Sequence, residues 1–409
     1  MDIKVELGLD LGNATPIGFK LDDAVRGKLD SVQYVLGGTL FYDISNRVQS
    51  LSTRRGKNQA LDRTDAGISS FTVDNSDRAF DPLYVAGPYY GALIPRREVR
   101  ITADTKPVFV GFIEDFDLQY SPGRATVQID VADAFSVLSN ATIDTLSPPS
   151  ELSGARVTRV LNLPEVNWSS TLRDIDAGNT VVLDSDVTNS SAIEYLQTVT
   201  SSEFGNLFIS KDGKVVFKER NSATNAPDII FTDDLTPSAS IKIPFAAIES
   251  IYGSENLFTR ISLANTDAVP DEVTVENTTS SALYGVRTYT DTGLLVQDPG
   301  ELSSLADALL ATYDKPTFRF ESVSVIIDKL SAIQSDAVLD LEIGDIVQVR
   351  FAPSGIPPAI ELPARIIGIS HSWELNLKRV SFTLETLNFG VFVLNSALFG
   401  QLDDDRLGY

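Results

Sequence analysis

The sequence predicts a mainly β protein in which two β-rich ends flank a smaller α+β module. Short segments with alternating apolar and polar residues recur at both ends and are separated by turn residues, a pattern typical of barrels and sandwiches. Ser, Thr and Val are plentiful, which favours strands. Between the two ends the apolar spacing becomes helical, most clearly at residues 190–204.

The N-terminal β-rich end starts at the first residue. Residues 1–11 alternate between apolar and charged side chains, which predicts an opening strand. Residues 12–30 mix Gly, Asn, Pro and charge, and we interpret them as a loop or mobile arm. Gly37-Gly38 separates two apolar runs and is typical of a hairpin turn. Further strands are predicted at residues 32–36, 39–44, 48–53, 68–73, 98–103, 107–116 and 124–131, followed by a helix at 131–139.

The middle of the chain predicts a small α+β module. The double proline at 148–149 marks its first boundary. Ser190 or Ser191 can cap a helix over residues 190–204. An Asp-Gly turn at 212–213 joins two short strands. The other expected elements are a helix at 154–163, strands at 207–209 and 215–217, and a connecting loop at 221–240.

The C-terminal β-rich end is expected to contain one helix, at residues 301–313, which Pro316 ends. The run LEIGDIVQV at residues 341–349 predicts a sheet edge bent at Gly344. Strands are predicted at residues 248–252, 259–263, 272–275, 318–327, 345–351, 364–370 and 379–387. The expected domains are residues 1–147, 148–240, 241–390 and a C-terminal extension at 391–409. The extension carries apolar residues that need a surface to cover, in this subunit or a neighbour: Phe392, Leu394, Leu398, Phe399, Leu402 and Leu407.

The composition excludes several classes of protein. The formal net charge of −23 disfavours binding to nucleic-acid phosphates or an anionic membrane. Such a charge serves solubility, or a pore lining that lets DNA pass without sticking. Without cysteine the chain has no disulfide and no thiolate metal site. No signal peptide is expected, and no apolar run reaches the roughly 20 residues that a membrane span needs.

Catalytic chemistry has few candidates. His371 is the single histidine, its neighbours alternate as in a strand, and no GxSxG elbow is present. We therefore expect a structural or surface histidine. The 56 Asp and Glu residues leave open a pair of glycosidase type, because separation in space is invisible in a sequence. No phosphate-binding glycine loop is present. We predict no catalytic, cofactor-binding or metal-binding residues, and no cofactor.

Two acidic clusters have an ordinary explanation. Asp74, Asn75, Asp77 and Asp81 faintly resemble a calcium loop, but their spacing misses its pattern. We interpret them as residues that accept hydrogen bonds in turns. Asp403 to Asp405 form a solvated charge run first and an ion site second.

The two dibasic clusters, Arg54-Arg55 and Arg96-Arg97, lack the interleaved aromatic residues that would stack on nucleic acid. Ion pairing with acidic neighbours, within the chain or across a subunit contact, is the favoured interpretation.

Residues 54–82, RRGKNQALDRTDAGISSFTVDNSDRAFDP, are followed by the motif GPYYGALIP, and the stretch SSALYGVRTYT lies at residues 280–290. In order and spacing these motifs resemble those of minor tail proteins of long-tailed phages, the baseplate or tail-tip hub subunits. The resemblance extends to the last residue, although the arm at residues 12–30 matches nothing in the family.

The resemblance implies a structural virion protein with two tail-tube-like β-barrel domains flanking the module. It implies a homotrimer that adapts a sixfold tube to a threefold tip. The implied neighbours are the hexameric distal tail protein, the tape measure protein and a central fibre or tip protein, with genomic DNA passing through the lumen. It also implies assembly in the host cytoplasm and residence at the virion tail tip. A tail-associated cell-wall hydrolase and a receptor- or carbohydrate-binding module stay open as alternatives.

Overall fold

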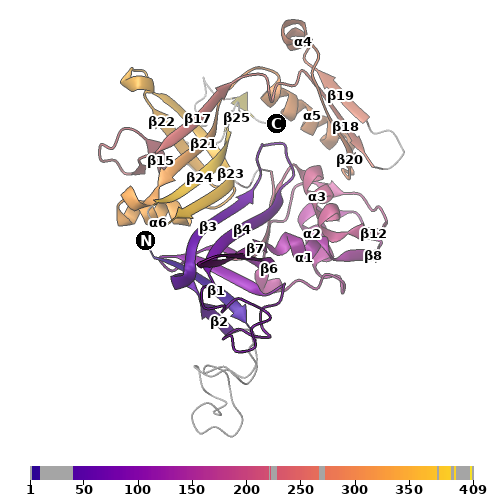
Figure 1. Ribbon diagram of the computed structural model, residues 1–409. Helices are drawn as coiled ribbons and strands as arrows, with labels where there is room; N and C mark the ends of the chain where they lie inside the picture. Colours follow the sequence, from indigo (N-terminus) through magenta and orange to yellow (C-terminus); the bar gives the residue numbers. More distant parts are fainter. Residues whose placement is uncertain are drawn as a thin grey trace.

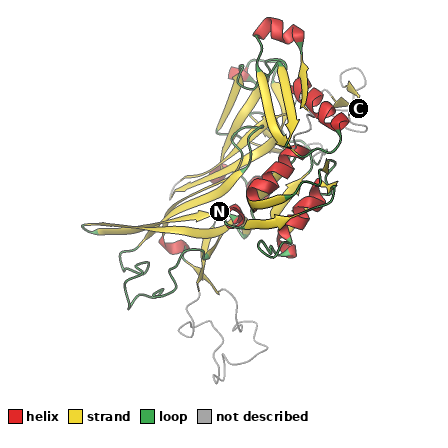
Figure 2. Cartoon of the chain, turned by 90° about the vertical axis from the view of Figure 1, so that its right-hand side faces the viewer, coloured by secondary structure: helices red, strands yellow, loops and turns green. Residues whose placement is uncertain are grey.

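The computed structural model describes residues 2–9, 40–220, 222, 228–266, 272–374 and 377–387, together with the backbone of two short strands, β25 (Val391–Phe392) and β26 (Arg406–Leu407). The chain is mainly β, with a large sheet that runs through the molecule (Figure 1). Most of the helices lie on one side of the long strands (Figure 2). The predicted fold class of a mainly β chain with an α+β insert is confirmed at this level.

Seven strands form the first β region. Every neighbouring pair is antiparallel, in the order β3-β4-β7-β6-β5-β1-β2. The end strands β2 and β3 are consecutive in the chain, and residues 44–47 alone join them. Four residues span at most about 14 Å, so the sheet curls until its ends are close. The bounds are β1 (Ile3–Leu9), β2 (Leu40–Asp43), β3 (Val48–Gly56), β4 (Asp65–Asp74), β5 (Glu98–Ala103), β6 (Lys106–Ser121) and β7 (Arg124–Ala132).

The second β region also has seven strands, in the order β17-β21-β24-β23-β22-β15-β16. Its end strands β16 and β17 are again consecutive in the chain, here joined by residues 244–246. This sheet therefore curls for the same reason. The bounds are β15 (Ile229–Thr232), β16 (Ile241–Ile243), β17 (Ala247–Tyr252), β21 (Phe318–Ile326), β22 (Ile346–Phe351), β23 (Ile360–Glu374) and β24 (Leu377–Thr386).

The two β regions share one strand order. Taken in chain order, β1 to β7 occupy the same sheet positions as β15, β16, β17, β21, β22, β23 and β24. The single difference in direction is β15, which runs parallel to both neighbours, whereas β1 is antiparallel to both. The chain therefore contains a structural repeat.

The longest hairpins of the two regions agree residue by residue. β6 and β7 are closed by the pair Ser121↔Arg124, and β23 and β24 by the pair Glu374↔Leu377. Each hairpin has a register shift at the same place, after Ile113 in β6 and after Ile366 in β23. The shared register and bulge position make the correspondence between the two strands unambiguous.

An α+β module follows the first β region in the chain, lies to one side of the long strands (right in Figure 1) and has its own hydrophobic core. Its helices are α1 (Ala134–Ser139), α2 (Ser153–Leu161) and α3 (Ala192–Glu203). Ser191 is the N-cap residue of α3, but its hydroxyl donates to Ser139 O and makes no capping bond. The strands are β8 (Thr142–Leu146), β9 (Glu151–Leu152), β10 (Arg173–Ile175), β11 (Val181–Val182), β12 (Val187–Ser191), β13 (Asn206–Ile209) and β14 (Val215–Lys218).

A further unit interrupts the second β region between β17 and β21. It consists of β18 (Arg260–Asn265), β19 (Glu272–Glu276), α4 (Thr278–Tyr284), β20 (Thr288–Leu294) and α5 (Pro299–Tyr313). Leu302, Leu305 and Ala306 of α5 pack on the three-stranded sheet and form a third core. The loop that joins β3 to β4 occupies the corresponding place in the first region.

Three expectations for the C-terminal end are wrong. Residues 221–240 are more than a connection, because they contain β15. The run at 341–349 is no sheet edge, because β22 is paired on both sides, with β15 and β23. The described residues of this part contain three α-helices rather than one: α4, α5 and α6 (Ala332–Asp340).

Candidate assembly site

The two β regions are joined edge to edge by β3 and β23. One edge of β23 pairs with β24 from Ala364 to Glu374. Its other edge is shared, because β22 covers residues 360–365 and β3 covers residues 368–374. One continuous hydrophobic core runs beneath both regions.

Two glycines allow the change of partner on β23. Gly56 has a φ of +94°, and a Cβ there would lie 2.2 Å from the carbonyl oxygen of Ile367. The same oxygen accepts a hydrogen bond from the amide of Lys57 at 2.8 Å. A Cβ on Gly368 would lie 2.7 Å from the oxygen of Lys57. Any larger residue at either position would push β3 away from β23.

A buried arginine beside this joint connects three parts of the chain. The guanidinium of Arg55, 3% exposed, donates to Glu342 at 2.8 Å and to the carbonyl oxygen of Ile209 at 3.1 Å. The second carboxylate oxygen of Glu342 accepts the amide of Lys211 at 2.9 Å. The first β region, the α+β module and the second β region are therefore held by one ionic group, whose removal would leave buried charge unpaired.

Asp133 lies next to this joint at the start of α1. Its carboxylate accepts the amides of Phe135 at 2.9 Å and Gly67 at 2.7 Å. Burial raises its pKa to about 7, while the two amides and Arg55 oppose the shift. The group anchors the module to β4.

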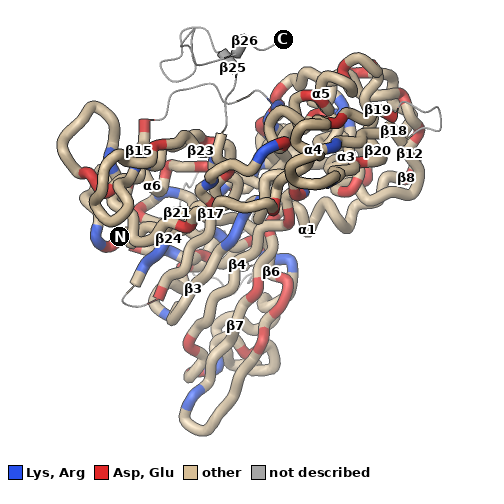
Figure 3. The backbone as a smooth tube through the Cα atoms, turned by 90° about the horizontal axis from the view of Figure 1, so that it is seen from above, with Lys and Arg blue, Asp and Glu red and all other residues tan. Residues whose placement is uncertain are grey.

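The edge that β3 covers on β23 is uncovered on β6. β5 pairs with residues 106–112 of β6, and β7 pairs with the opposite edge as far as Ser121. From Asp115 to Ser121 no strand within the described ranges pairs with the first edge. In Figure 3 this hairpin projects from the rest of the chain.

β17 holds the position in the second region that β3 holds in the first. It pairs with β21 on one edge, and none of the described strands pairs with its other edge. Unpaired strand edges expose a row of backbone donors and acceptors that favour pairing with another chain. The uncovered edge of β6 therefore corresponds to the edge of β23 that pairs with β3. The uncovered edge of β17 corresponds to the edge of β3 that pairs with β23.

Burial follows this difference between the repeats. Leu51 of β3 faces Trp373 of β23, and the two are 4% and 3% exposed. The residue of β6 that corresponds to Trp373 is Tyr120, which is 57% exposed. A large aromatic residue occupies the position in both strands, and only one is covered.

The face of the continuous sheet opposite the core is polar. One row of cross-strand pairs runs from Asp115 through Asp130, Ser70 and Ser52 to Ser372. The same face also carries Arg54, Arg379 and the exposed Ile68. Its short hydroxyl and carboxylate side chains make few attractive contacts with phosphate groups. Further members of the face are Thr72, Ser322, Ser324, Ser370, Ser381 and Thr383.

His371 lies inside the joint between β3 and β23. It is 6% exposed, and its Nδ1 is 2.9 Å from the hydroxyl of Thr53. Burial, with Arg55 and Lys211 nearby, lowers its pKa to about 3. The ring is therefore neutral at pH 7 and packs inside the joint beside Thr53 and Trp373.

The acidic cluster at the end of β4 caps turns, as predicted. Asn75 accepts the amide of Phe80, Asp77 that of Ala79, and Asp81 that of Leu83. Asp74 accepts the hydroxyl of Ser76. Throughout the described residues, no three His, Asp or Glu side chains form a group that could hold a metal ion.

The predicted ion pairing of the dibasic clusters is confirmed for Arg55 and for Arg96, which contacts Glu114 at 3.0 Å. Asp403 to Asp405, the arm at residues 12–30 and the apolar side chains of the C-terminal extension lie outside the described residues. No helix in the described part of the chain is both long and apolar enough to cross a membrane.

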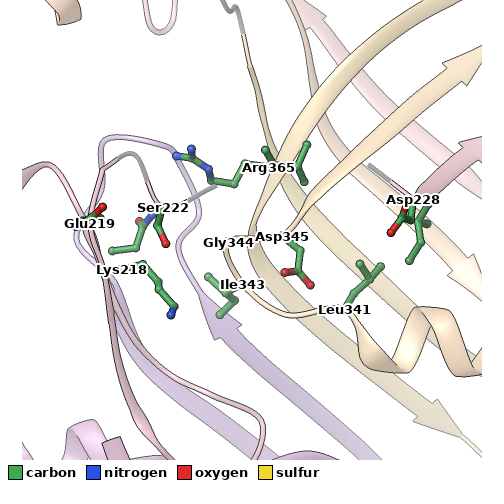
Figure 4. Close-up of a pocket in the computed structure, with 12 residues that line it drawn as sticks. Lys218, Glu219, Ser222, Asp228, Leu341, Ile343, Gly344, Asp345 and Arg365 are labelled. Carbon is green, nitrogen blue, oxygen red and sulfur yellow. The ribbon is translucent and has the colours of Figure 1, made fainter. Parts of the chain in front are cut away.

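A cavity of about 420 Å³ lies between the α+β module and the second β region (Figure 4). Among its charged side chains, those of Asp345, Lys218 and Arg365 have partners within the protein. Asp345 accepts the amide of Glu342 at 2.8 Å, and Lys218 contacts Asp174 and Asp176 at 3.1 and 3.2 Å. Each of these contacts lies within one of the two units. The cavity gives the hydrolase alternative no specific supporting observation.

Comparison with solved structures places this fold among phage tail proteins. The chain superposes on a tail protein of Neisseria meningitidis MC58 with a TM-score of 0.60 at 11% identity, covering 95% of this chain and 97% of that one. A 43 kDa tail protein of prophage MuSo2 from Shewanella oneidensis gives a TM-score of 0.55 at 12% identity, covering 93% and 97%. No family model and no curated protein sequence matches.

A third similar structure is the E. coli c3393 protein, a type VI secretion system component described as similar to the T4 bacteriophage tail proteins gp27 and gp5. Its TM-score is 0.50 at 9% identity, covering 84% of this chain and 74% of that one. At such identities the match shows the fold alone. The resemblance to tail proteins read from the sequence is confirmed at that level.

Proposed function

We propose that the chain is a structural virion protein, a baseplate or tail-tip hub subunit of a long, non-contractile phage tail. Three copies form a ring that closes and extends the tail tube. The observation that supports this most strongly is the repeat of one strand order in the two β regions. Two tube-like units per chain turn three copies into six units, which adapts sixfold to threefold symmetry.

Each curled β region is proposed to be a tail-tube-like barrel. The close ends of each sheet support this, because β2 and β3, and likewise β16 and β17, are consecutive in the chain. The domains expected from the sequence, 1–147, 148–240, 241–390 and the extension at 391–409, are proposed with two adjustments. Helix α1 and strand β8 belong with the module, and β15 belongs with the second barrel.

The ring closes when the joint within one chain is repeated between chains. Within the chain, β3 pairs antiparallel with residues 368–374 of β23. By correspondence, β17 of one copy pairs antiparallel with residues 115–121 of β6 in the next copy. Such a head-to-tail contact uses the uncovered edges of β17 and β6, and it generates a ring when the rotation between copies closes after three.

The correspondence also fixes the register of the contact. Ser50 of β3 faces Glu374 of β23, and these residues correspond to Ala247 and Ser121. One residue further along, Ile248 faces Tyr120 and covers its exposed ring. This contact would bury two apolar side chains that water now reaches.

The polar face of the joined sheets is proposed to line the lumen through which genomic DNA passes. Its hydroxyl and carboxylate side chains and the net charge of −23 support passage without specific binding. The proposed neighbours are the distal tail protein hexamer, the tape measure protein and a central fibre or tip protein. Location at the tail tip after assembly in the host cytoplasm, without membrane insertion and without enzymatic activity, completes the proposal.

A matched pair of disulfides tests this proposal, since the natural chain has no cysteine. S50C/E374C should form a bond within one chain. S121C/A247C, its counterpart, should give covalent dimers and trimers on a non-reducing gel, with a trimer mass in solution. The control A247C/Y120C places its sulfur atoms on opposite faces and should not link. A chain that stays monomeric and unlinked at about 100 μM, above the Kd of a stable contact, would contradict the ring.

A further inference from the structure

An exposed apolar loop joins β4 to β5 at the outer side of the first β region. We call residues 82–95 the rim loop. Leu83 is 84% exposed, Val85 72%, Tyr90 48% and Ile94 46%. Exposed apolar side chains that gather in one segment mark an interaction surface more often than single ones do.

The rim loop is held in place from below. Tyr89 packs against Phe80 and against Tyr42 of β2, with ring centroids 5.2 and 6.3 Å apart. Ala92 and Leu93 are buried. The exposed side chains therefore stand on an anchored segment.

The repeat identifies what the rim loop corresponds to. In the second β region the connection between β21 and β22 contains α6, which is anchored on β16 where Gln334 donates to Lys242 O at 2.7 Å. β16 corresponds to β2, so both connections rest on the same strand of their region.

The β21–β22 connection, which contains α6, contacts the first β region. Lys106, at the start of β6, contacts Asp340 of α6 at 2.6 Å and donates to the carbonyl oxygen of Asp336 at 3.1 Å. Thus α6 covers the turn between β5 and β6. This contact and the β3–β23 pairing both join the second β region to the first.

The counterpart of that turn is the turn between β22 and β23, residues 352–359, which we call the rim turn. Ile356 is 68% exposed, and the prolines at 357 and 358 are exposed beside it. The contact within the chain joins Lys106 to the acidic side chains of α6. The corresponding contact between copies would join the apolar rim loop to the apolar rim turn.

We propose that the rim loop of one copy packs on the rim turn of the next copy. This inference rests on the proposed ring, because the β17–β6 pairing brings these two segments together. A second copy is the occupant that the repeat specifies, since the corresponding segments already touch within each chain. The contact is apolar, so its strength will change little with salt.

The test is an assembly equilibrium measured by analytical ultracentrifugation. L83S/V85S and I356S should each raise the concentration for half-dissociation roughly tenfold, since one buried aliphatic side chain contributes more than the energy of a tenfold change. Their combination should be less than additive, because they remove the same contact. The control L283S changes an equally exposed leucine, 71% exposed on α4, and should have no effect.

The outcomes separate this inference from the ring itself. If S121C/A247C still links chains while the rim variants assemble like the natural protein, the rim contact is overturned and the ring stands. The rim contact is also overturned if L83S/V85S impairs tail attachment but leaves the trimer unchanged, since another tail protein would then be the occupant. If neither linking nor a trimer is found, both fall.

Discussion

The first and second β regions share one strand order, yet their long hairpins have different surroundings. The edge of β23 between residues 368 and 374 is covered by β3, whereas the matching edge of β6 is uncovered. Trp373 is accordingly buried and Tyr120 exposed. The chain thus contains one complete strand pairing, between β3 and β23. The two strands that correspond to this pair, β17 and β6, each have an uncovered edge.

The largest expected difference is between these two aromatic residues. Trp373→Ala should lower the free energy of unfolding by about 4 kcal/mol, because it empties a packed site. Tyr120→Ala should cost the monomer less than about 1 kcal/mol and should instead weaken assembly. Urea unfolding and sedimentation of the two variants measure the contrast. Equal losses of monomer stability would show that the two hairpins are equally covered.

Arg55→Met breaks the three-way connection beside the joint. We expect a loss of about 3 kcal/mol, because Glu342, whose side chain is 20% exposed, keeps a largely buried charge without its partner. The control is Arg96→Met, since the Arg96–Glu114 pair is 41% and 39% exposed and should contribute less than about 1 kcal/mol. Similar unfolding midpoints for the two variants would contradict the role given to Arg55.

The fold could be predicted from sequence where alternation is strong. The strands from Glu98 to Ala103 and from Arg124 to Ala132 were found because one face of each is buried. β15 and β16 were missed because they are three or four residues long, lie in a polar segment and have little alternation. α6 was missed although Ser331 and Gln334 form a capping box, a signal that the sequence contains.

The repeat and the assembly site could not be predicted from sequence. Corresponding positions differ in residue type, as His371 and Leu118 do, so the repeat is recognised from strand order and register and not from shared residues. An unpaired strand edge depends on which strands lie beside it, and that is decided by long-range pairing. The resemblance to tail proteins supplied the two-unit expectation, and the strand order now supports it by a separate route.

A smaller effect is expected at the two glycines that have positive φ and different surroundings. Gly56→Ala should cost about 2 to 3 kcal/mol, because its Cβ would meet the oxygen of Ile367 as well as an unfavourable backbone conformation. Gly123→Ala, at a φ of +80° with nothing within 4 Å, should cost about 1 kcal/mol. Chemical unfolding of both variants measures the difference between the two losses of stability, which is the part caused by the close approach of β3 to β23.

The pH dependence of the joint is expected to be smaller again. The pKa of His371 is lowered to about 3 in the folded chain, so the unfolded chain binds the additional proton between pH 6.5 and 3. Stability is therefore lost as the pH falls, by about 2 kcal/mol between pH 7 and 5. His371→Gln should remove this part of the pH dependence. An unchanged slope in pH-dependent unfolding would mean that the ring is charged in the fold.

Hydrogen exchange tests the pairing of β17 with β6 most directly. Amides of β3 should be protected at every concentration, because β23 covers them within the chain. Amides of residues 247–252 and 115–121 should exchange rapidly from their uncovered edges in dilute monomer and become protected together as the chain assembles. Assembly that leaves both segments unprotected, or that protects only one of them, would contradict the account.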